Sequence, residues 1–88
     1  NKAGQPKDFV ATIAGKCCES GDLLGEGVLI QKPEVNDVLA VLSTGAYNYS
    51  MASHYNRITK PAVVSVNKGK IKLIVKRENI DDIIKNDI

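Results

Sequence analysis

Short apolar and β-branched stretches separated by turns dominate the pattern of this chain. Residues 9–14 (FVATIA) have the composition of a pleated strand, and residues 28–30 predict a second, shorter one. The segment GKCCESGDLLGEG, which begins at Gly15, carries four glycines without a helical period and predicts a strand end followed by a shaped loop. Residues 38–43 are almost continuously apolar, which predicts a buried strand.

A β-hairpin over residues 62–77 is the clearest local prediction. Closing the chain around Lys68 and Gly69 places six apolar residues on one face, while lysines alternate to the other face. The six form three cross-strand pairs, Val66 with Ile71, Val64 with Leu73 and Ala62 with Val75. A four-residue loop over 67–70 would give the same pairing, so the pattern sets the register and leaves the turn type open.

Two short helices are expected in addition to the strands. Tyr47, Met51 and Tyr55 recur at four-residue intervals, which places them on one stripe of a helix that by default faces the core. Asn79 has the side chain of an N-cap, and the acidic residues 81–82 would complement the dipole of a terminal helix. The predicted class is mainly β, a small β barrel or sandwich with a short inserted helix and a short C-terminal helix.

The composition indicates one small domain. The chain has 88 residues, 43% of them hydrophobic, and 12 basic against 10 acidic side chains leave a net charge of +2. It has neither a phosphate-tracking basic patch nor an apolar run of membrane-spanning length, so no nucleic acid or membrane partner is expected. Residues 1–8 are polar and predict a loose lead-in to a domain over 9–88. Because the chain starts with Asn1 rather than Met, we expect it to be part of a longer protein.

Chemistry that core packing does not require is concentrated in residues 18–22, which place a thiol beside a carboxylate on a glycine-rich loop. Taken alone, the segment still favours a buried cysteine followed by a solvated acidic turn. The neighbouring cysteines 17 and 18 cannot bridge each other without distortion, which indicates a reducing compartment, the cytoplasm. His54 lies in a polar stretch and is expected on the surface. No metal-ligand cluster, phosphate-cradling glycine motif or Ser/His/Asp constellation is present in the sequence.

The segment GKCCESGD, followed by DVLAVLSTGAYNYSMASHYNRITKPAVVSV, resembles the C-terminal part of diaminopimelate decarboxylases. These are pyridoxal-phosphate enzymes whose catalytic half is a barrel like that of alanine racemase. The resemblance runs from about residue 13 to residue 77. Its motifs occur in order as Cys18–Asp22, Gly45–Tyr47, Ser50–Ser53, Tyr55–Asn56 and Pro61.

The resemblance implies a role for several residues. Cys18 would be the proton donor, supplied to the active site of the neighbouring subunit of a homodimer. Glu19 would contact the substrate at the end remote from the reacting carbon, and Tyr47 would contact both the substrate and the phosphate of pyridoxal 5'-phosphate. Tyr55 and Asn56 would support the part of the site that Tyr47 lines. Cys17 is expected to point away from Cys18 and pack, because side chains alternate along a strand.

Elementary chemistry agrees with the roles that the resemblance implies. A thiol with an ordinary pKa of about 8.5 is mostly protonated near neutrality and can act as a general acid. An ionised carboxylate beside it disfavours the thiolate and can also pair with a substrate ammonium group. A tyrosine hydroxyl can donate a hydrogen bond to a phosphate oxygen.

The implied reaction converts meso-diaminopimelate to L-lysine and carbon dioxide, the last step of lysine biosynthesis. The cofactor-binding lysine of this family lies in the barrel half, so the 88 residues alone are expected to be inactive. A decarboxylase of the same fold acting on ornithine, arginine or carboxynorspermidine is an alternative, although Glu19 and the Ser20-Gly21-Asp22 continuation favour diaminopimelate. A β-barrel binding module without enzyme activity is a further alternative.

Overall fold

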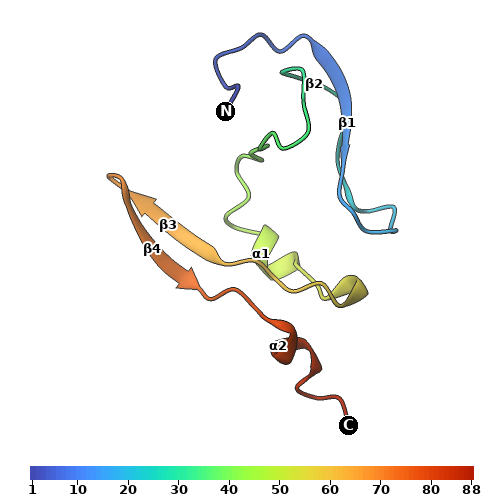
Figure 1. The fold of residues 1–88 in the computed structure, drawn as a ribbon, viewed down its shortest axis with the longest axis vertical. Coiled ribbons are helices and arrows are strands. Elements are labelled where there is room, and N and C mark those ends of the chain that lie inside the picture. Colours follow the sequence, from blue (N-terminus) through green and yellow to red (C-terminus); the bar gives the residue numbers. More distant parts are fainter. The chain divides into compact units, whose positions relative to one another are not determined.

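The computed structural model describes residues 1–88, which divide into two units, Asn1–Leu42 and Ser43–Ile88 (Figure 1). Each unit contains one two-stranded antiparallel sheet. The elements are β1 (Phe9–Ala14), β2 (Leu23–Ile30), α1 (Asn48–Met51), the 3₁₀ turn η1 (Tyr55–Arg57), β3 (Val63–Asn67), β4 (Lys70–Val75) and α2 (Ile80–Ile84). The mainly β class with two short helices is therefore confirmed, but the strands form two hairpins and no closed barrel. None of the helices has the length and apolar character that crossing a membrane requires.

In the first unit, β1 has the predicted bounds, whereas β2 begins five residues earlier than the sequence predicted. Its first half pairs with β1 in spite of two glycines, because the register shifts twice, between Ala11 and Ile13 and again before Ala14. Each shift accommodates one extra residue on β2, as a β-bulge does. Gly27 lies beside the first bulge with φ +61°, a conformation that other residues rarely adopt. The glycine-rich loop is therefore shorter than predicted and ends at Asp22.

The predicted strand over residues 38–43 is not formed. A strand needs a neighbour for its backbone hydrogen bonds, and no strand of these 88 residues pairs with this segment. Its side chains are also exposed rather than buried, Val38 at 77% and Leu42 at 83%. An apolar run of this length indicates burial without specifying the partner, which is why the sequence alone was misleading here.

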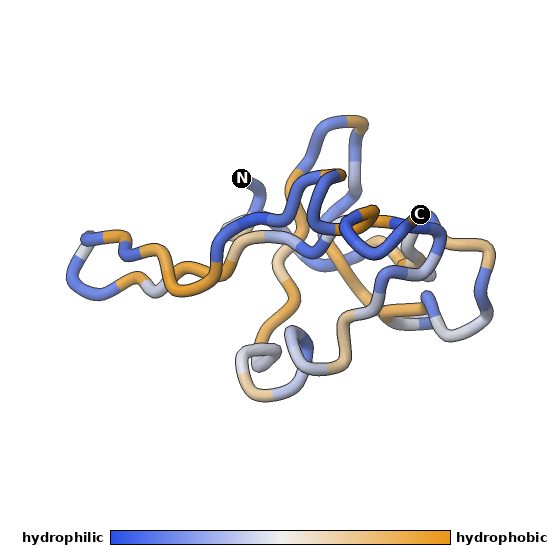
Figure 2. The backbone as a smooth tube through the Cα atoms, turned by 90° about the horizontal axis from the view of Figure 1, so that it is seen from below, coloured by the Kyte–Doolittle hydropathy of each residue, from blue (hydrophilic) through white to orange (hydrophobic).

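The second hairpin confirms most of the predicted register. Val66 pairs with Ile71 and Val64 with Leu73. The third predicted pair is wrong, because a bulge before Val75 moves that residue opposite Val63. The turn takes the two-residue form, with φ values of +49° at Lys68 and +74° at Gly69, as in a type I′ turn. Along this hairpin, hydrophobic and polar positions alternate, and the turn itself is hydrophilic (Figure 2).

The two helices differ in how well their sequence defines them. α2 is confirmed and is closed by a capping box, in which the Asp82 N–H donates to Asn79 Oδ1 at 3.1 Å and the Asn79 N–H donates to Asp82 Oδ2 at 2.9 Å. α1 ends at Met51, because Ala52 is extended, so the predicted stripe is not continuous. Met51 and Tyr55 are 77% and 43% exposed, so the default expectation that this stripe faces a core is wrong. Tyr47, which the resemblance places at a ligand instead, is 71% exposed.

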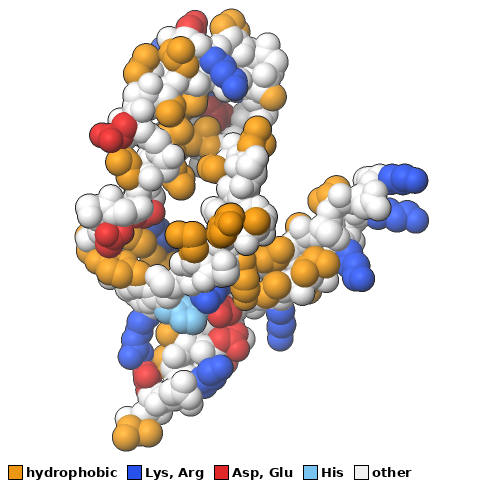
Figure 3. Space-filling view, turned by 180° about the vertical axis from the view of Figure 1, so that it is seen from behind, with side chains coloured by type: hydrophobic (Ala, Val, Ile, Leu, Met, Phe, Trp, Pro, Cys, Tyr) orange, Lys and Arg blue, Asp and Glu red, His pale blue; other side chains and the backbone are white.

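These 88 residues have no apolar core of their own, since no side chain among them is fully buried. Apolar side chains from both units reach the surface instead (Figure 3). Burial of apolar surface is the main favourable term in folding. We therefore expect the stability of this domain to depend on contacts with further protein surface.

Candidate active site

The loop that joins β1 to β2 carries the thiol and carboxylate singled out in the sequence. Its ends are tied together, because the Gly15 N–H donates to the Asp22 carbonyl oxygen at 2.9 Å. Within it, the Asp22 N–H donates to the Glu19 carbonyl oxygen at 3.1 Å and closes a tight turn over residues 19–22. The loop thus continues the hairpin, and its tip is a defined turn.

Cys18 and Glu19 both lie exposed on this loop. The Ser20 hydroxyl donates to Glu19 Oε1 at 3.4 Å. Glu19 also folds back over Gly21, where a side-chain Cβ would lie 2.7 Å from Glu19 Oε2. A glycine at this position therefore lets the carboxylate lie against the turn, and the loop presents a thiol and a carboxylate to its surroundings.

Cys17 has a different environment from its neighbour. It is half-buried, and its N–H donates to Asp22 Oδ2 at 2.7 Å. Burial, followed by the negative charge of the Asp22 carboxylate, raises the pKa of the Cys17 thiol. Cys17 is thus the more covered member of the pair, in keeping with a packing role.

Tyr47 belongs to the second unit. It precedes α1, and its carbonyl oxygen accepts hydrogen bonds from the Met51 N–H and the Ser50 hydroxyl, each at 2.9 Å. These backbone contacts hold the residue while its ring stays exposed. Its phenol is therefore presented outward, where it can donate a hydrogen bond to a ligand.

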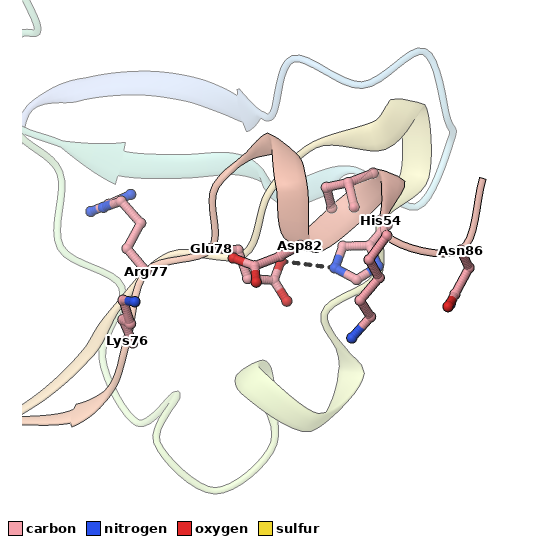
Figure 4. A pocket seen from close by; sticks show the side chains of 8 residues that line it. His54, Lys76, Arg77, Glu78, Asp82 and Asn86 are labelled. Atoms are coloured by element: carbon pink, nitrogen blue, oxygen red, sulfur yellow. Dashed lines mark hydrogen bonds and ion pairs between the residues drawn. The ribbon is translucent and has the colours of Figure 1, made fainter. Parts of the chain in front are cut away.

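A polar pocket of about 310 Å³ lies between α2 and the segment that carries His54 (Figure 4). His54 is exposed, as predicted, and its Nε2 lies 2.8 Å from Glu78 Oε2. The same carboxylate oxygen accepts from the Lys60 N–H at 2.7 Å, and the Glu78 N–H donates to the Lys60 carbonyl oxygen at 3.2 Å. The Lys60 N–H, and after it His54, lower the pKa of Glu78. Glu78 therefore ties the end of β4 to the segment that follows η1, a link that the sequence did not predict.

We expect this link to weaken in acid. Because the pKa of Glu78 is lowered in the folded protein, its stabilising effect is present above the ordinary glutamate pKa and is lost as the pH falls through the folded-state value. In the full-length protein, Glu78→Ala, which removes the acceptor oxygen, should give at neutral pH a several-fold loss of Lys60 amide protection, as acid does in the unaltered protein. Hydrogen exchange followed by mass spectrometry measures this protection, and equal protection in both proteins across the pH range would contradict the expectation.

The loop between β1 and β2 thus presents an exposed thiol and an exposed carboxylate on neighbouring residues. Residues 1–45 match the family model described as "Pyridoxal-dependent decarboxylase, C-terminal sheet domain". The chain therefore belongs to this family.

Named relatives cover most or all of the chain. It is 51% identical over 88 residues to a diaminopimelate decarboxylase of Bacillus subtilis, covering 100% of this chain and 20% of that protein. A diaminopimelate decarboxylase of Synechocystis is 50% identical over 76 residues, covering 86% of this chain and 16% of that protein. The crystal structure of diaminopimelate decarboxylase from M. jannaschi matches with a TM-score of 0.85 and 44% identity, covering 91% of this chain and 18% of that one. The chain thus spans about a fifth of the length of these relatives.

Proposed function

We propose that this chain is the C-terminal sheet domain of a diaminopimelate decarboxylase, which releases carbon dioxide from meso-diaminopimelate and forms L-lysine. The observation that carries the proposal is the exposed Cys18–Glu19 pair on a closed loop, in a chain 51% identical over its whole length to a protein of that name. The enzyme would work in the cytoplasm, in the last step of lysine biosynthesis. This domain would supply the proton donor and the substrate contacts.

Cys18 is the general acid in this proposal. Loss of a carboxyl group as carbon dioxide leaves an electron pair on the reacting carbon, which must take up one proton to give the product amine. The proton comes from Cys18 Sγ, and the thiolate that remains recovers a proton from water. Because Cys18 is exposed, the thiol is accessible to a substrate held by another part of the enzyme.

Glu19 binds the remote end of the substrate by charge. Diaminopimelate carries an ammonium group at the end remote from the reacting carbon, and a carboxylate can accept a charge-assisted hydrogen bond from it. Since Glu19 is adjacent to Cys18, binding of the remote ammonium would also bring the other end of the molecule into a fixed relation to the thiol.

Pyridoxal 5'-phosphate, when bound, supplies the electron sink that makes loss of the carboxyl group possible. These residues fit a contact at the edge of the cofactor, because the exposed Tyr47 hydroxyl can donate to a phosphate oxygen and its ring can lie against the substrate. The lysines of the hairpin, at positions 68, 70 and 72, are exposed, and Lys76 lines the polar pocket beside His54 and Glu78. The lysine that holds the cofactor is therefore expected in the barrel domain.

The active site would be shared between the two subunits of a homodimer. Cys18 and Glu19 lie exposed on their loop, which supports a role at a surface that meets other protein. Apolar side chains such as Val10 and Leu24, exposed at 63% and 58% on the paired strands β1 and β2, offer further surface for such contacts.

A direct activity assay tests the proposed function. The full-length protein containing this chain, loaded with pyridoxal 5'-phosphate, should release carbon dioxide from meso-diaminopimelate, with a higher kcat/KM than for ornithine, arginine or carboxynorspermidine. The 88-residue chain alone should release none. Preference for one of the other substrates would reassign the enzyme within its fold, and carbon dioxide release by the isolated chain would contradict its role as a partial active site.

A further inference from the structure

Asp22, the last residue of the Cys-Glu-Ser-Gly-Asp segment, takes part in three hydrogen bonds within its loop. Its carbonyl oxygen accepts from the Gly15 N–H at 2.9 Å, and its own N–H donates to the Glu19 carbonyl oxygen at 3.1 Å. Its side-chain Oδ2 accepts from the Cys17 N–H at 2.7 Å. One residue thereby contacts the start of the loop, the residue before the thiol, and the residue that carries the carboxylate.

The space for the Asp22 carboxylate depends on Gly15. A Cβ added at position 15 would overlap the carboxylate group of Asp22. The φ angle of Gly15 is not positive, so its backbone conformation is open to other residues. What this position requires is the absence of a side chain. The Asp22 carboxylate therefore occupies the space that a side chain at position 15 would take.

We propose that Asp22 is a positioning residue, whose carboxylate holds the Cys17 backbone and so fixes the direction in which Cys18 and Glu19 are presented. The role rests on the proposed function, in which those two residues meet the substrate. Cys17 immediately precedes Cys18, so a change in the Cys17 backbone moves the point from which the thiol projects. Displacement of a reacting group by about 1 Å can lower a rate about 10²-fold.

The side-chain hydrogen bond needs an acceptor oxygen at position 22 and not a negative charge as such. Asparagine keeps one oxygen at nearly the same place, whereas alanine removes it. In the full-length enzyme we therefore expect Asp22→Ala to lower kcat about 10- to 100-fold and Asp22→Asn to stay within about threefold of the unaltered enzyme. The solvent deuterium isotope effect on kcat should rise in Asp22→Ala, because transfer of the thiol proton becomes more rate-limiting.

A readout independent of activity separates this inference from the proposed function. The Cys17 amide should be protected from hydrogen exchange in the unaltered protein and in Asp22→Asn, and should lose that protection in Asp22→Ala. If the unaltered protein is not a decarboxylase, the exchange pattern still tests the bond, while the proposed function fails by itself. Asp8→Ala, an exposed acidic residue just before β1, is the matched control and should change neither quantity.

Gly15→Ala tests the same inference without touching Asp22. The added methyl group should push the carboxylate away, expose the Cys17 amide and lower kcat as Asp22→Ala does, so this variant serves if Asp22→Ala does not fold. Equal losses in Asp22→Asn and Asp22→Ala would mean that charge, and not the acceptor oxygen, is what matters, and would overturn the proposal. Unchanged kcat and unchanged Cys17 protection in both Asp22→Ala and Gly15→Ala would also overturn it.

Discussion

Replacing Cys18 by alanine in the full-length enzyme is expected to lower kcat about 10²- to 10⁴-fold, the range that a positioned general acid contributes. The substrate should still bind, because the thiol is proposed to act on the reacting carbon after the carboxyl group has left. KM should therefore change little. Steady-state kinetics of carbon dioxide and lysine formation measure both quantities, and the ratio of the two products reports whether protonation keeps pace with decarboxylation.

Cys17→Ala is the matched control, since the same atoms are removed one residue away. Cys17 is half-buried, whereas Cys18 is exposed, so the control should leave kcat within about twofold of the unaltered enzyme. A large loss of kcat in Cys17→Ala together with normal turnover in Cys18→Ala would show that Cys17, and not Cys18, donates the proton. Normal turnover in both variants would remove cysteine from the mechanism altogether.

The second large effect is expected for Glu19→Gln, and it should appear in KM rather than in kcat. Loss of a hydrogen bond between a carboxylate and an ammonium group should raise KM for diaminopimelate about 10- to 100-fold. A substrate without the remote amine, 2-aminopimelate, should be turned over equally well by both proteins, because it never made this contact. Comparing kcat/KM for the two substrates measures the discrimination that Glu19 provides.

Glu26→Gln provides the control for the Glu19 experiment. Glu26 is exposed on β2 of the same hairpin, so the substitution removes the same charge from the same unit without altering the loop. It should leave KM for both substrates unchanged. If Glu19→Gln lowers kcat/KM for diaminopimelate and 2-aminopimelate alike, the residue does not read the remote amine.

Local patterns predicted the elements whose partners are close in sequence. The β3–β4 hairpin follows from alternation around Lys68 and Gly69, and α2 follows from the cap at Asn79, because a few neighbouring residues decide each. Residues 38–43 failed for the opposite reason, since an apolar run needs a partner strand that these residues do not contain. The missed bulges in β2 and β4 also depend on how two strands fit together, which alternation in a single strand does not express.

In the candidate site, too, some features could be predicted from the sequence and others could not. The loop could be predicted from the residues, but the residues alone favoured a buried cysteine, and only the family resemblance implied the accessible thiol that Cys18 presents. The bond from Asp22 to the Cys17 backbone could not, because residues five positions apart meet only once the loop is closed. The link between Glu78 and Lys60 joins residues 18 positions apart and leaves no periodic signal in the sequence.

The two bulges in the first hairpin have a consequence for how the enzyme could be altered. One inserted residue inverts which side of a strand its side chains occupy, and a second restores the original phase. Deleting a single residue from β2 would therefore turn the side chains at the start of β2 to the opposite face of the hairpin. The residues of the Cys-Glu-Ser-Gly-Asp segment would all be unchanged. The number of residues in β2 therefore constrains the orientation of the loop as strictly as the identity of its side chains does.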